Sequence, residues 1–436
     1  MTLPSGLPTL HPMSSFRFLH AADLHLDSPL RGLQRYDGLP LERIRGATRG
    51  ALDNLVNLAI DRRVDFLVIA GDLYDGTWKD AGTGLYMARA LGRLVEAGIR
   101  VYILQGNHDA ASLISRDVPL PPGVQRFSTT KPETFRLDDL QVALHGQGFE
   151  SRQVVSDMTP AYPPPVPGWF NIGVLHTSLG GYSAHETYAP CAPETLFAKG
   201  YDYWALGHVH ERMEFGSGPY IVFPGVLQGR HIHESGPKGA TLVTVENGRI
   251  AHLDHCPCDV LRWAELAIDC AGMTSESALH DAISTRLASA CNEALGDRLL
   301  VARLTLGGAT SLDARLRLRA SGVRDSVLEI AQMLPGTPAI EKVEIRTTPP
   351  PKVLSEGETE GMADIRALIA QALADPLLVE EARSELAPLL NTLSSIDMTD
   401  APEDALALAR ADEWARLLTE ATHALDARLG ITGDDA

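Results

Sequence analysis

Short apolar runs separated by longer segments with helical periodicity dominate the first part of this 436-residue chain. Runs at Phe16–His20, Phe66–Ala70 and Val101–Leu104 predict strands, and the second is apolar throughout, as in parallel strands buried on both faces. The segments Leu41–Asp61 and Gly84–Glu96 carry apolar residues at helical spacing and predict helices. The order strand-helix-strand-helix-strand predicts an open α/β sheet.

Two more strands are predicted before the pattern changes after Asp259. They cover Asn171–Leu175 and Tyr203–Leu206. Beyond Asp259, strands alternate with helices in a compact α+β unit, with strands predicted at Trp263–Asp269, Leu299–Leu306 and Ile340–Thr347 and helices at Glu276–Ala294 and Val323–Leu334.

The last part of the chain carries two apolar stripes at helical spacing, formed by Ile365, Leu368, Ile369 and Leu373 and by Trp414, Leu417, Leu418, Ala421 and Leu425. The stripes fit a helical hairpin packed on itself or on the preceding unit, and equally a docking surface for a partner. We therefore expect four segments: a disordered tail (residues 1–14), a first domain (15–259), an α+β domain (260–348) and an acidic helical region (349–436).

Composition indicates a soluble protein that does not cross a membrane. The apolar content of 44% and the charged content of 22% are those of a globular domain. No apolar run approaches the ~18 residues needed to cross a bilayer, and Met1–Ser14 lacks the basic and apolar regions of a secretory signal. The five cysteines are scattered and odd in number, which favours reduced thiols and a cytoplasmic location.

The net charge of −18 is unevenly distributed along the chain. From Glu356 to Ala436 there are 18 acidic and 5 basic residues, whereas residues 1–355 have a net charge of only −5. A lopsided charge of this kind suggests an interaction tail. Five arginines between Arg31 and Arg49 add a local positive excess, which can contact phosphates or belong to a solvated helix face.

Every predicted strand of the first domain ends in polar residues that can bind metals. The five ends are Asp23-Leu24-His25, Gly71-Asp72, Gly106-Asn107-His108-Asp109, His176 and Gly207-His208-Val209-His210. Burying such groups unpaired costs on the order of a few kcal/mol each, so they are poor core material. Singly, each suits a turn or a surface histidine, but five in one chain indicate a shared site.

The spacing within two of these motifs favours joint coordination of a cation. If the backbone there is extended, Asp23 and His25 point to the same side, and so do His208 and His210. Carboxylate and imidazole ligands together suit a borderline ion such as manganese, iron or zinc.

As an ordered set, these motifs resemble those of the calcineurin-like metallophosphoesterases, over roughly residues 16–259. Within that superfamily the chain resembles the SbcD-type DNA-repair exonucleases, and most closely their YhaO branch. The finer match rests on Phe18–Pro29, Tyr188–Cys191 and Phe223–His231. The resemblance implies a four-layer α/β/β/α sandwich in the α/β class, followed by a small α+β capping domain and the C-terminal helical region.

The resemblance also implies roles for individual residues. One metal ion would bind Asp23, His25 and His210, the other would bind Asn107, His176 and His208, and Asp72 would bridge the two. The residues themselves suggest further roles: His108 follows the ligand Asn107 without being assigned to a metal, so it is the catalytic candidate, with Asp109 orienting it. Arg230 and His231 follow a strand and are candidates for contact with the substrate phosphate. Manganese is the expected metal, with iron or zinc as alternatives.

Simple electrostatics supports this arrangement. Two divalent cations against the carboxylates of Asp23 and Asp72 leave a net positive centre, which attracts a phosphodiester. The cations would also lower the pKa of a bound water, so no side-chain base is needed to form the nucleophile.

The resemblance implies a two-metal phosphodiester hydrolase that acts as a DNA exonuclease in DNA repair. DNA and an SbcC-like coiled-coil ATPase are the implied partners, together with self-association into a homodimer. Two other functions stay open: hydrolysis of a small phosphodiester or phosphomonoester, and a non-catalytic scaffold that binds DNA ends. A scaffold is expected to have lost ligands, and all seven are present.

Overall fold

The structure is a computed structural model that describes residues 15–30, 41–75, 81–111, 119–180, 188–294 and 296–350, and shorter stretches between 368 and 422. The predicted tail at residues 1–14 lies outside the described residues, as do Arg31 and Arg35 of the arginine-rich segment. The chain divides into two compact units. The first comprises residues 1–30, 40–263 and 296–299, and the second comprises the rest.

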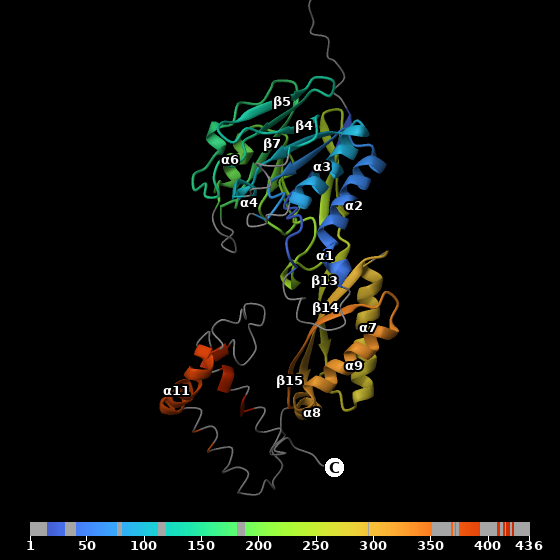
Figure 1. Cartoon of the computed structure of the whole chain (residues 1–436), viewed down its shortest axis with the longest axis vertical. Helices are drawn as coiled ribbons and strands as arrows, with labels where there is room; N and C mark the ends of the chain where they lie inside the picture. Colours follow the sequence, from blue (N-terminus) through green and yellow to red (C-terminus); the bar gives the residue numbers. More distant parts are fainter. Residues whose placement is uncertain are drawn as a thin grey trace, which may run out of the picture. The chain divides into compact units, whose positions relative to one another are not determined.

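The first unit contains two six-stranded sheets (Figure 1). In spatial order, the first sheet consists of β12 (Arg249–Pro257), β11 (Gly239–Glu246), β1 (Phe16–Ala21), β2 (Phe66–Ala70), β3 (Arg100–Leu104) and β4 (Val124–Arg126). Strands β1 to β4 run parallel, whereas β11 is antiparallel to both of its neighbours. The carboxyl ends of β1, β2 and β3 therefore lie at one edge of this sheet.

The second sheet has a similar parallel centre. In spatial order it consists of β5 (Glu133–Leu137), β6 (Val142–Gly146), β7 (Phe170–His176), β8 (Tyr203–Gly207), β10 (Tyr220–Phe223) and β9 (Met213–Phe215). Strands β6, β7, β8 and β10 are parallel, and the two edge strands are antiparallel to them.

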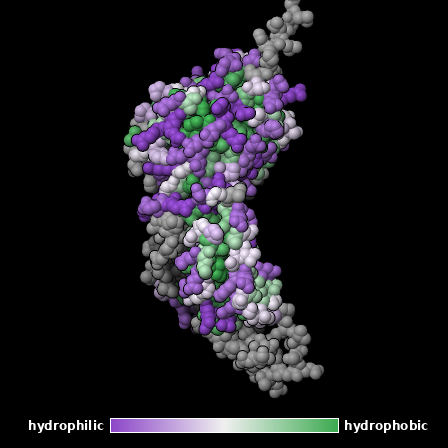
Figure 2. All heavy atoms as spheres, turned by 90° about the vertical axis from the view of Figure 1, so that its right-hand side faces the viewer, coloured by the Kyte–Doolittle hydropathy of each residue, from purple (hydrophilic) through white to green (hydrophobic). Residues whose placement is uncertain are grey.

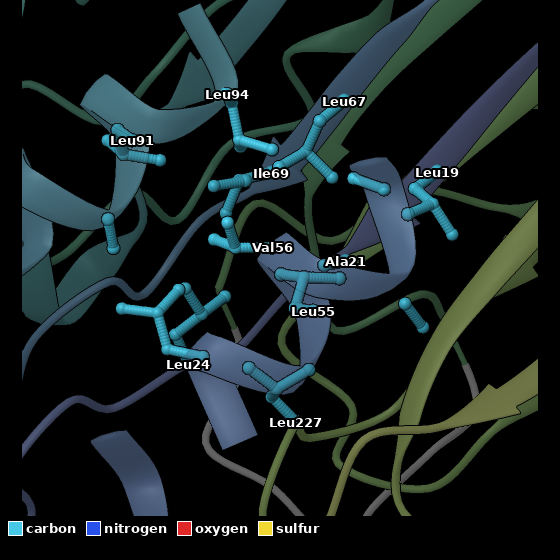
Figure 3. Packing of buried hydrophobic residues seen from close by; sticks show 14 of the residues in the cluster. Leu19, Ala21, Leu24, Leu55, Val56, Leu67, Ile69, Leu91, Leu94 and Leu227 are labelled. Carbon is cyan, nitrogen blue, oxygen red and sulfur yellow. The ribbon is translucent and has the colours of Figure 1, made fainter. Parts of the chain in front are cut away.

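Three of the apolar cores among the described residues of the first unit hold its layers together. The core between the two sheets includes Phe18 and Val68 from the first and Val174 from the second. On the outer side of the first sheet, α2 (Ala47–Arg62) and α3 (Ala81–Glu96) pack side chains such as Leu55 and Leu91 onto the strands (Figure 3).

The outer face of the second sheet is covered by α6 (Pro193–Ala198) and the turn η1 (Thr159–Ala161). Its core includes Leu196 of α6 and Trp204 of β8. The predicted layered α/β/β/α arrangement is thus confirmed.

The helix predicted over residues 41–61 is divided in the structure. It consists of α1 (Leu41–Arg45) and α2, separated at Gly46, because glycine is a weak helix former. Helix α3 starts three residues before the predicted position. The third strand leads into a short helix, α4 (Asn107–Ala111), rather than a simple turn.

The second unit contains a three-stranded sheet covered by helices on one face. In chain order, its elements are β13 (Leu261–Asp269), α7 (Glu276–Ala294), β14 (Leu299–Ala309), α8 (Asp313–Leu318), α9 (Ala320–Met333) and β15 (Ala339–Thr348). All five predicted elements are present, and α8 is additional. Strands β14 and β15 are parallel, and side chains such as Leu304 and Ile283 form the core.

The C-terminal part is described only in short stretches. Along the sequence, helix α11 (Pro376–Thr392) falls after the first predicted apolar stripe and before the second. Trp414 of the second stripe is buried, with the Arg383 guanidinium 5.8 Å from the centre of its indole ring. Ile365, Ile369, Leu373 and Leu425 lie outside the described residues.

Hydrophilic atoms predominate on the surface shown in Figure 2, with apolar atoms in smaller groups between them. Among the described residues, no helix is long and apolar enough to cross a membrane.

Candidate metal centre

The candidate site lies where the carboxyl ends of β1, β2, β3, β7 and β8 meet. All seven side chains predicted to bind metals follow or end one of these strands. Six of the seven are buried: Asp23, His25, Asp72, Asn107, His176 and His208. The structure therefore brings together side chains that are spread over 188 positions of the sequence.

Left-handed backbone conformations shape the loops of the site. Asp23, His25, Asp72 and His208 have φ angles of 51°, 41°, 54° and 99°. Such angles are uncommon for residues other than glycine and often mark functional sites. The backbone is therefore not extended at Asp23, His25 and His208, so the alternation of an extended segment does not apply there, and the loops reach the site by tight turns.

Hydrogen bonds between strand ends hold these turns. The amide of Asp23 donates to the carbonyl of Gly71, and that of His25 donates to the carbonyl of Asp72, both at 3.0 Å. Gly106 is needed beside them, because a Cβ atom there would lie 2.2 Å from Asp72 Oδ1. The glycine lets the third strand end approach the Asp72 carboxylate.

One group of ligand atoms belongs to Asp23, His25 and His210, all within 4.8 Å of one another. The Nε2 atoms of His25 and His210 are 3.3 Å apart. Nδ1 of His210 lies 2.6 Å from Oε1 of Glu234, a carboxylate whose pKa is held well below its usual range; burial opposes this shift, but His210 and Arg230 outweigh it. His210 therefore donates its Nδ1 proton to Glu234, and its Nε2 is the ring nitrogen that faces His25 and the other ligand atoms.

A second group consists of Asp23, Asp72 and His176. Nε2 of His176 lies 3.3 Å from Asp72 Oδ2 and 2.9 Å from Asn107 Oδ1. Nδ1 of His176 donates to the carbonyl of Ala70 at 2.9 Å, which directs Nε2 towards the site. The ring of His208 packs against that of His176, with centroids 5.3 Å apart.

Charges in the cluster perturb each other strongly. Burial would lower the pKa of His176, but the Asp72 carboxylate outweighs it and raises this pKa to about 9. Burial would raise the pKa of Asp72, but His176 and His25 hold it well below its usual range. The Asp72 carboxylate and the His176 imidazole therefore stabilise each other's charged forms, and a cation bound to the imidazole nitrogen would displace its proton.

The structure corrects the predicted partner of His108. Its Nδ1 lies 2.9 Å from Oδ1 of Asp75, not beside Asp109. Burial would lower the pKa of His108, but the hydrogen bond to Asp75 and the charge of Asp72 raise it. Because the pKa of Asp75 is lowered, chiefly by this hydrogen bond, Nδ1 donates the proton and Nε2 faces away from Asp75.

The carboxylate of Asp109 instead binds backbone amide groups of the loops around the site. It accepts hydrogen bonds from the amides of Leu73, Tyr74 and Gly106, at 2.9 to 3.1 Å. All its described contacts are thus with the loops that carry Asp72 and Asn107. Burial, and then the charge of Asp72, raise its pKa to about 7.

Arg230 lies at the edge of the site and His231 beside it. Nη1 of Arg230 is 3.5 Å from Ser28 Oγ, and Nη2 is 3.2 Å from His210 Nδ1 and 3.4 Å from Glu234 Oε1. The buried Nε has no hydrogen-bond partner among the described residues. Nε2 of His231 is 3.4 Å from the same Glu234 oxygen. The guanidinium is therefore held in place with donors still available for an anion.

Sequence reasoning missed two carboxylates at this site, Asp75 and Glu234. The short spacing of Gly71-Asp72-Leu73-Tyr74-Asp75 was a usable signal for the first. Glu234 follows the matched segment ending at His231 and offered no comparable signal.

The donor set fits divalent cations. Two groups of three ligand atoms share Asp23, and a third group of His25, Asp75 and His108 lies beside them. Mixed imidazole and carboxylate donors suit manganese, iron or zinc. Since the burial of so many ionisable groups is costly without a counter-charge, the geometry favours a cluster completed by cations.

Two family models match the chain. Residues 16–212 match the model described as calcineurin-like phosphoesterase, and residues 263–348 match the middle domain of metallophosphoesterase YhaO.

Curated relatives agree with these matches. The uncharacterized metallophosphoesterase YhaO of Bacillus subtilis is 34% identical over 275 residues, covering 62% of this chain and 67% of that protein. The DNA double-strand break repair protein Mre11 of Methanopyrus kandleri is 27% identical over 54% of this chain, and that of Sulfurisphaera tokodaii is 26% identical over 53%. The matches span 52% and 60% of the lengths of these two Mre11 proteins.

Solved structures are matched at lower identity. TT1561 of Thermus thermophilus is 15% identical with a TM-score of 0.31, covering 54% of this chain and all of that one. A dimetal phosphatase from Danio rerio is 12% identical with a TM-score of 0.33, covering 53% of this chain and 93% of that one.

Proposed function

Because the chain belongs to the calcineurin-like metallophosphoesterase family, in the branch of YhaO, we propose that it is a two-metal phosphodiester hydrolase that acts as a DNA exonuclease in DNA repair. The observation that carries the proposal is the convergence of imidazole and carboxylate ligand atoms within 4.8 Å, beside the His108–Asp75 pair. The similarity to Mre11 repair proteins supports DNA as the substrate.

In this proposal one cation would be held by Asp23, His25 and His210 and the other by Asn107, His176 and His208, with Asp72 as a ligand that both would share. Bound divalent cations act as Lewis acids and provide a nucleophile from water at neutral pH. Manganese is the proposed metal, because mixed carboxylate and imidazole donors suit it. The chain contributes the rigid placement of these ligands, through the inter-strand hydrogen bonds and the Glu234 and Ala70 contacts of the two histidines.

Arg230 is proposed to bind a non-bridging oxygen of the substrate phosphate. Its Nε is buried without a hydrogen-bond partner among the described residues. Its terminal nitrogens lie 3.4 and 3.5 Å from oxygens of Glu234 and Ser28, and Nη2 is also 3.2 Å from Nδ1 of His210. A phosphate oxygen at this position would accept a charge-assisted hydrogen bond. His231 is proposed to assist from the rim of the site.

His108 is proposed to protonate the leaving oxygen. Its side chain is 31% exposed, and its Nδ1 proton is held by Asp75, so Nε2 is the nitrogen that can reach a substrate. When the P–O bond breaks, the leaving oxygen takes the proton from Nε2. Asp75, rather than the predicted Asp109, serves as the orienting carboxylate.

This chain alone has little net positive charge with which to bind DNA, because even residues 1–355, outside the acidic tail, have a net charge of −5. Duplex binding draws heavily on lysine and arginine. An SbcC-like coiled-coil ATPase is the proposed partner that supplies further DNA affinity. We also propose a cytoplasmic location and self-association as a homodimer.

The direct test is a hydrolysis assay with purified protein in Mn²⁺. We expect release of nucleotides from linear duplex or single-stranded DNA that is faster than hydrolysis of cyclic nucleotides or nitrophenyl esters. Asp72→Ala serves as the inactive control. Hydrolysis of small esters alone would replace the DNA substrate with a small phosphodiester or phosphomonoester. DNA-end binding without any hydrolysis would favour the scaffold.

A further inference from the structure

Ser28 joins the residues proposed to bind phosphate and to donate a proton. Its hydroxyl donates to Oδ2 of Asp75 at 3.0 Å, while Oδ1 of the same carboxylate accepts the Nδ1 proton of His108 at 2.9 Å. The Ser28 oxygen also lies 3.5 Å from Nη1 of Arg230, which can donate to it. One hydroxyl proton and one lone pair satisfy both contacts without conflict.

The loop that carries Ser28 is held rigidly. The preceding residue, Asp27, has a φ angle of 59°, and its carboxylate accepts hydrogen bonds from Arg49 and Thr83. The amide of Asp27 donates to Thr48 Oγ1 at 3.0 Å, and that of Ser28 donates to the carbonyl of His25. Ser28 itself is 8% exposed. Its hydroxyl is therefore placed by the fold before any substrate arrives.

We propose that Ser28 is a positioning residue of the hydrolytic site, which fixes the Asp75 carboxylate so that His108 presents Nε2 to the leaving oxygen. The inference rests on the proposed function and extends it to a residue outside the ligand motifs. Asp75 has two carboxylate oxygens and two described partners for them, Ser28 and His108. Removing the hydroxyl frees the carboxylate to rotate and loosens the imidazole that depends on it.

The test uses two phosphate esters that differ only in their leaving group. Phenyl esters leave poorly and need protonation, whereas p-nitrophenyl esters leave well and need it less. For Ser28→Ala we expect kcat to fall about tenfold on the phenyl ester and less than about twofold on the nitrophenyl ester, with KM and bound metal unchanged. Ser28→Thr, which keeps the hydroxyl, should restore the phenyl ester rate.

A double-mutant cycle with Asp75→Asn tests whether Ser28 acts through Asp75. In that background, Ser28→Ala should cause no further loss on the phenyl ester. Thr48→Val is the matched control, because it removes a hydroxyl that holds the same loop without contacting Asp75. It should leave the ratio of the two ester rates unchanged. Equal losses on both esters for Ser28→Ala, or losses that add in the double variant, would overturn the inference.

A second measurement does not depend on turnover. In protein with ¹⁵N-labelled histidine and bound zinc, the Nδ1 proton of His108 should give a downfield resonance that Ser28→Ala broadens and Thr48→Val does not. A resonance that is unchanged in Ser28→Ala contradicts the positioning role. If the wild-type chain hydrolyses no ester, the proposed function fails while this resonance still decides the inference.

Discussion

Buried carboxylates have different partners in the second unit and among the proposed metal ligands of the first unit. In the second unit, Arg303 donates from Nε and Nη2 to both oxygens of Glu341, at 2.7 and 2.6 Å. Nearby, Glu344 accepts from Lys342 and Arg346. Both glutamates are buried, and each has a cationic side chain from its own unit.

In the candidate site of the first unit, the partners of the carboxylates are imidazoles rather than lysine or arginine side chains. Among the described residues, no lysine or arginine pairs with Asp23 or Asp72, and the ion-pair partners of Asp72 are His25 and His176. The carboxylates instead point towards imidazoles that can give up their protons. The difference teaches that one cluster is complete as folded, whereas the other is arranged to be completed by cations from solution.

Removing the carboxylate shared by the proposed metals should have the largest effect. Asp72→Ala should leave the chain with neither ion and reduce hydrolysis to the uncatalysed background, because both metals lose a ligand and the counter-charge between them. Metal analysis by mass spectrometry after dialysis measures this directly. Retention of two ions would rule out the shared position of Asp72.

Removing the proposed proton donor should affect turnover without affecting the metals. His108→Ala should keep both ions and lose about 10²–10⁴-fold in kcat on esters with poor leaving groups. Parallel metal analysis and kinetics separate the two effects. A near-normal rate would dismiss the role of His108.

Breaking the buried ion pair of Arg303 and Glu341 in the second unit should lower the stability of the protein without affecting metal binding. Arg303→Met leaves Glu341 buried without its partner and should lower the free energy of unfolding by about 3 kcal/mol. Arg346→Met is the control, since its side chain is 53% exposed and its loss should cost less than about 1 kcal/mol. Urea denaturation compares the variants. If Arg303→Met also removed the bound metal, the contrast between the two clusters would be wrong.

A buried histidine between the sheets should make the first unit sensitive to acid. Nδ1 of His20 accepts from the Tyr203 hydroxyl and Nε2 donates to the carbonyl of Leu206, so the ring is neutral. Burial lowers its pKa to about 3. Below pH 6.5 the unfolded chain binds a proton that the folded chain does not, so the free energy of unfolding falls as the pH falls towards 3.

His20→Gln tests this dependence. Between pH 7.5 and pH 5, the wild type should lose about 2 kcal/mol more than the variant, as measured by urea denaturation. His252→Gln, at an exposed position of β12, is the control and should lose as much as the wild type. An equal loss in His20→Gln and the wild type would place the acid sensitivity elsewhere.

Most of the fold, and the strand ends that meet at the candidate site, could be predicted from the sequence. Strands such as Phe66–Ala70 are apolar and are followed by glycine and a polar residue. A short stretch of sequence is therefore enough to predict that the strand is buried and that its carboxyl end belongs to the candidate site. Helix α7 matches its predicted bounds, because its apolar positions are evenly spaced.

Contacts between distant segments could not be predicted. His108 and Asp75 are 33 positions apart, and their pairing depends on the left-handed turn at Asp72. Asp109, adjacent to His108 in the sequence, is directed to backbone amides because it lies in the first turn of α4. Neighbours in sequence were therefore a poor guide to neighbours in the site.

The central claim is tested most directly by locating manganese in crystals of the protein through its anomalous scattering. The account predicts two peaks, one among Asp23, His25 and His210 and one among Asn107, His176 and His208, both in contact with Asp72. A single peak, or a peak held only by His25, Asp75 and His108, would contradict it.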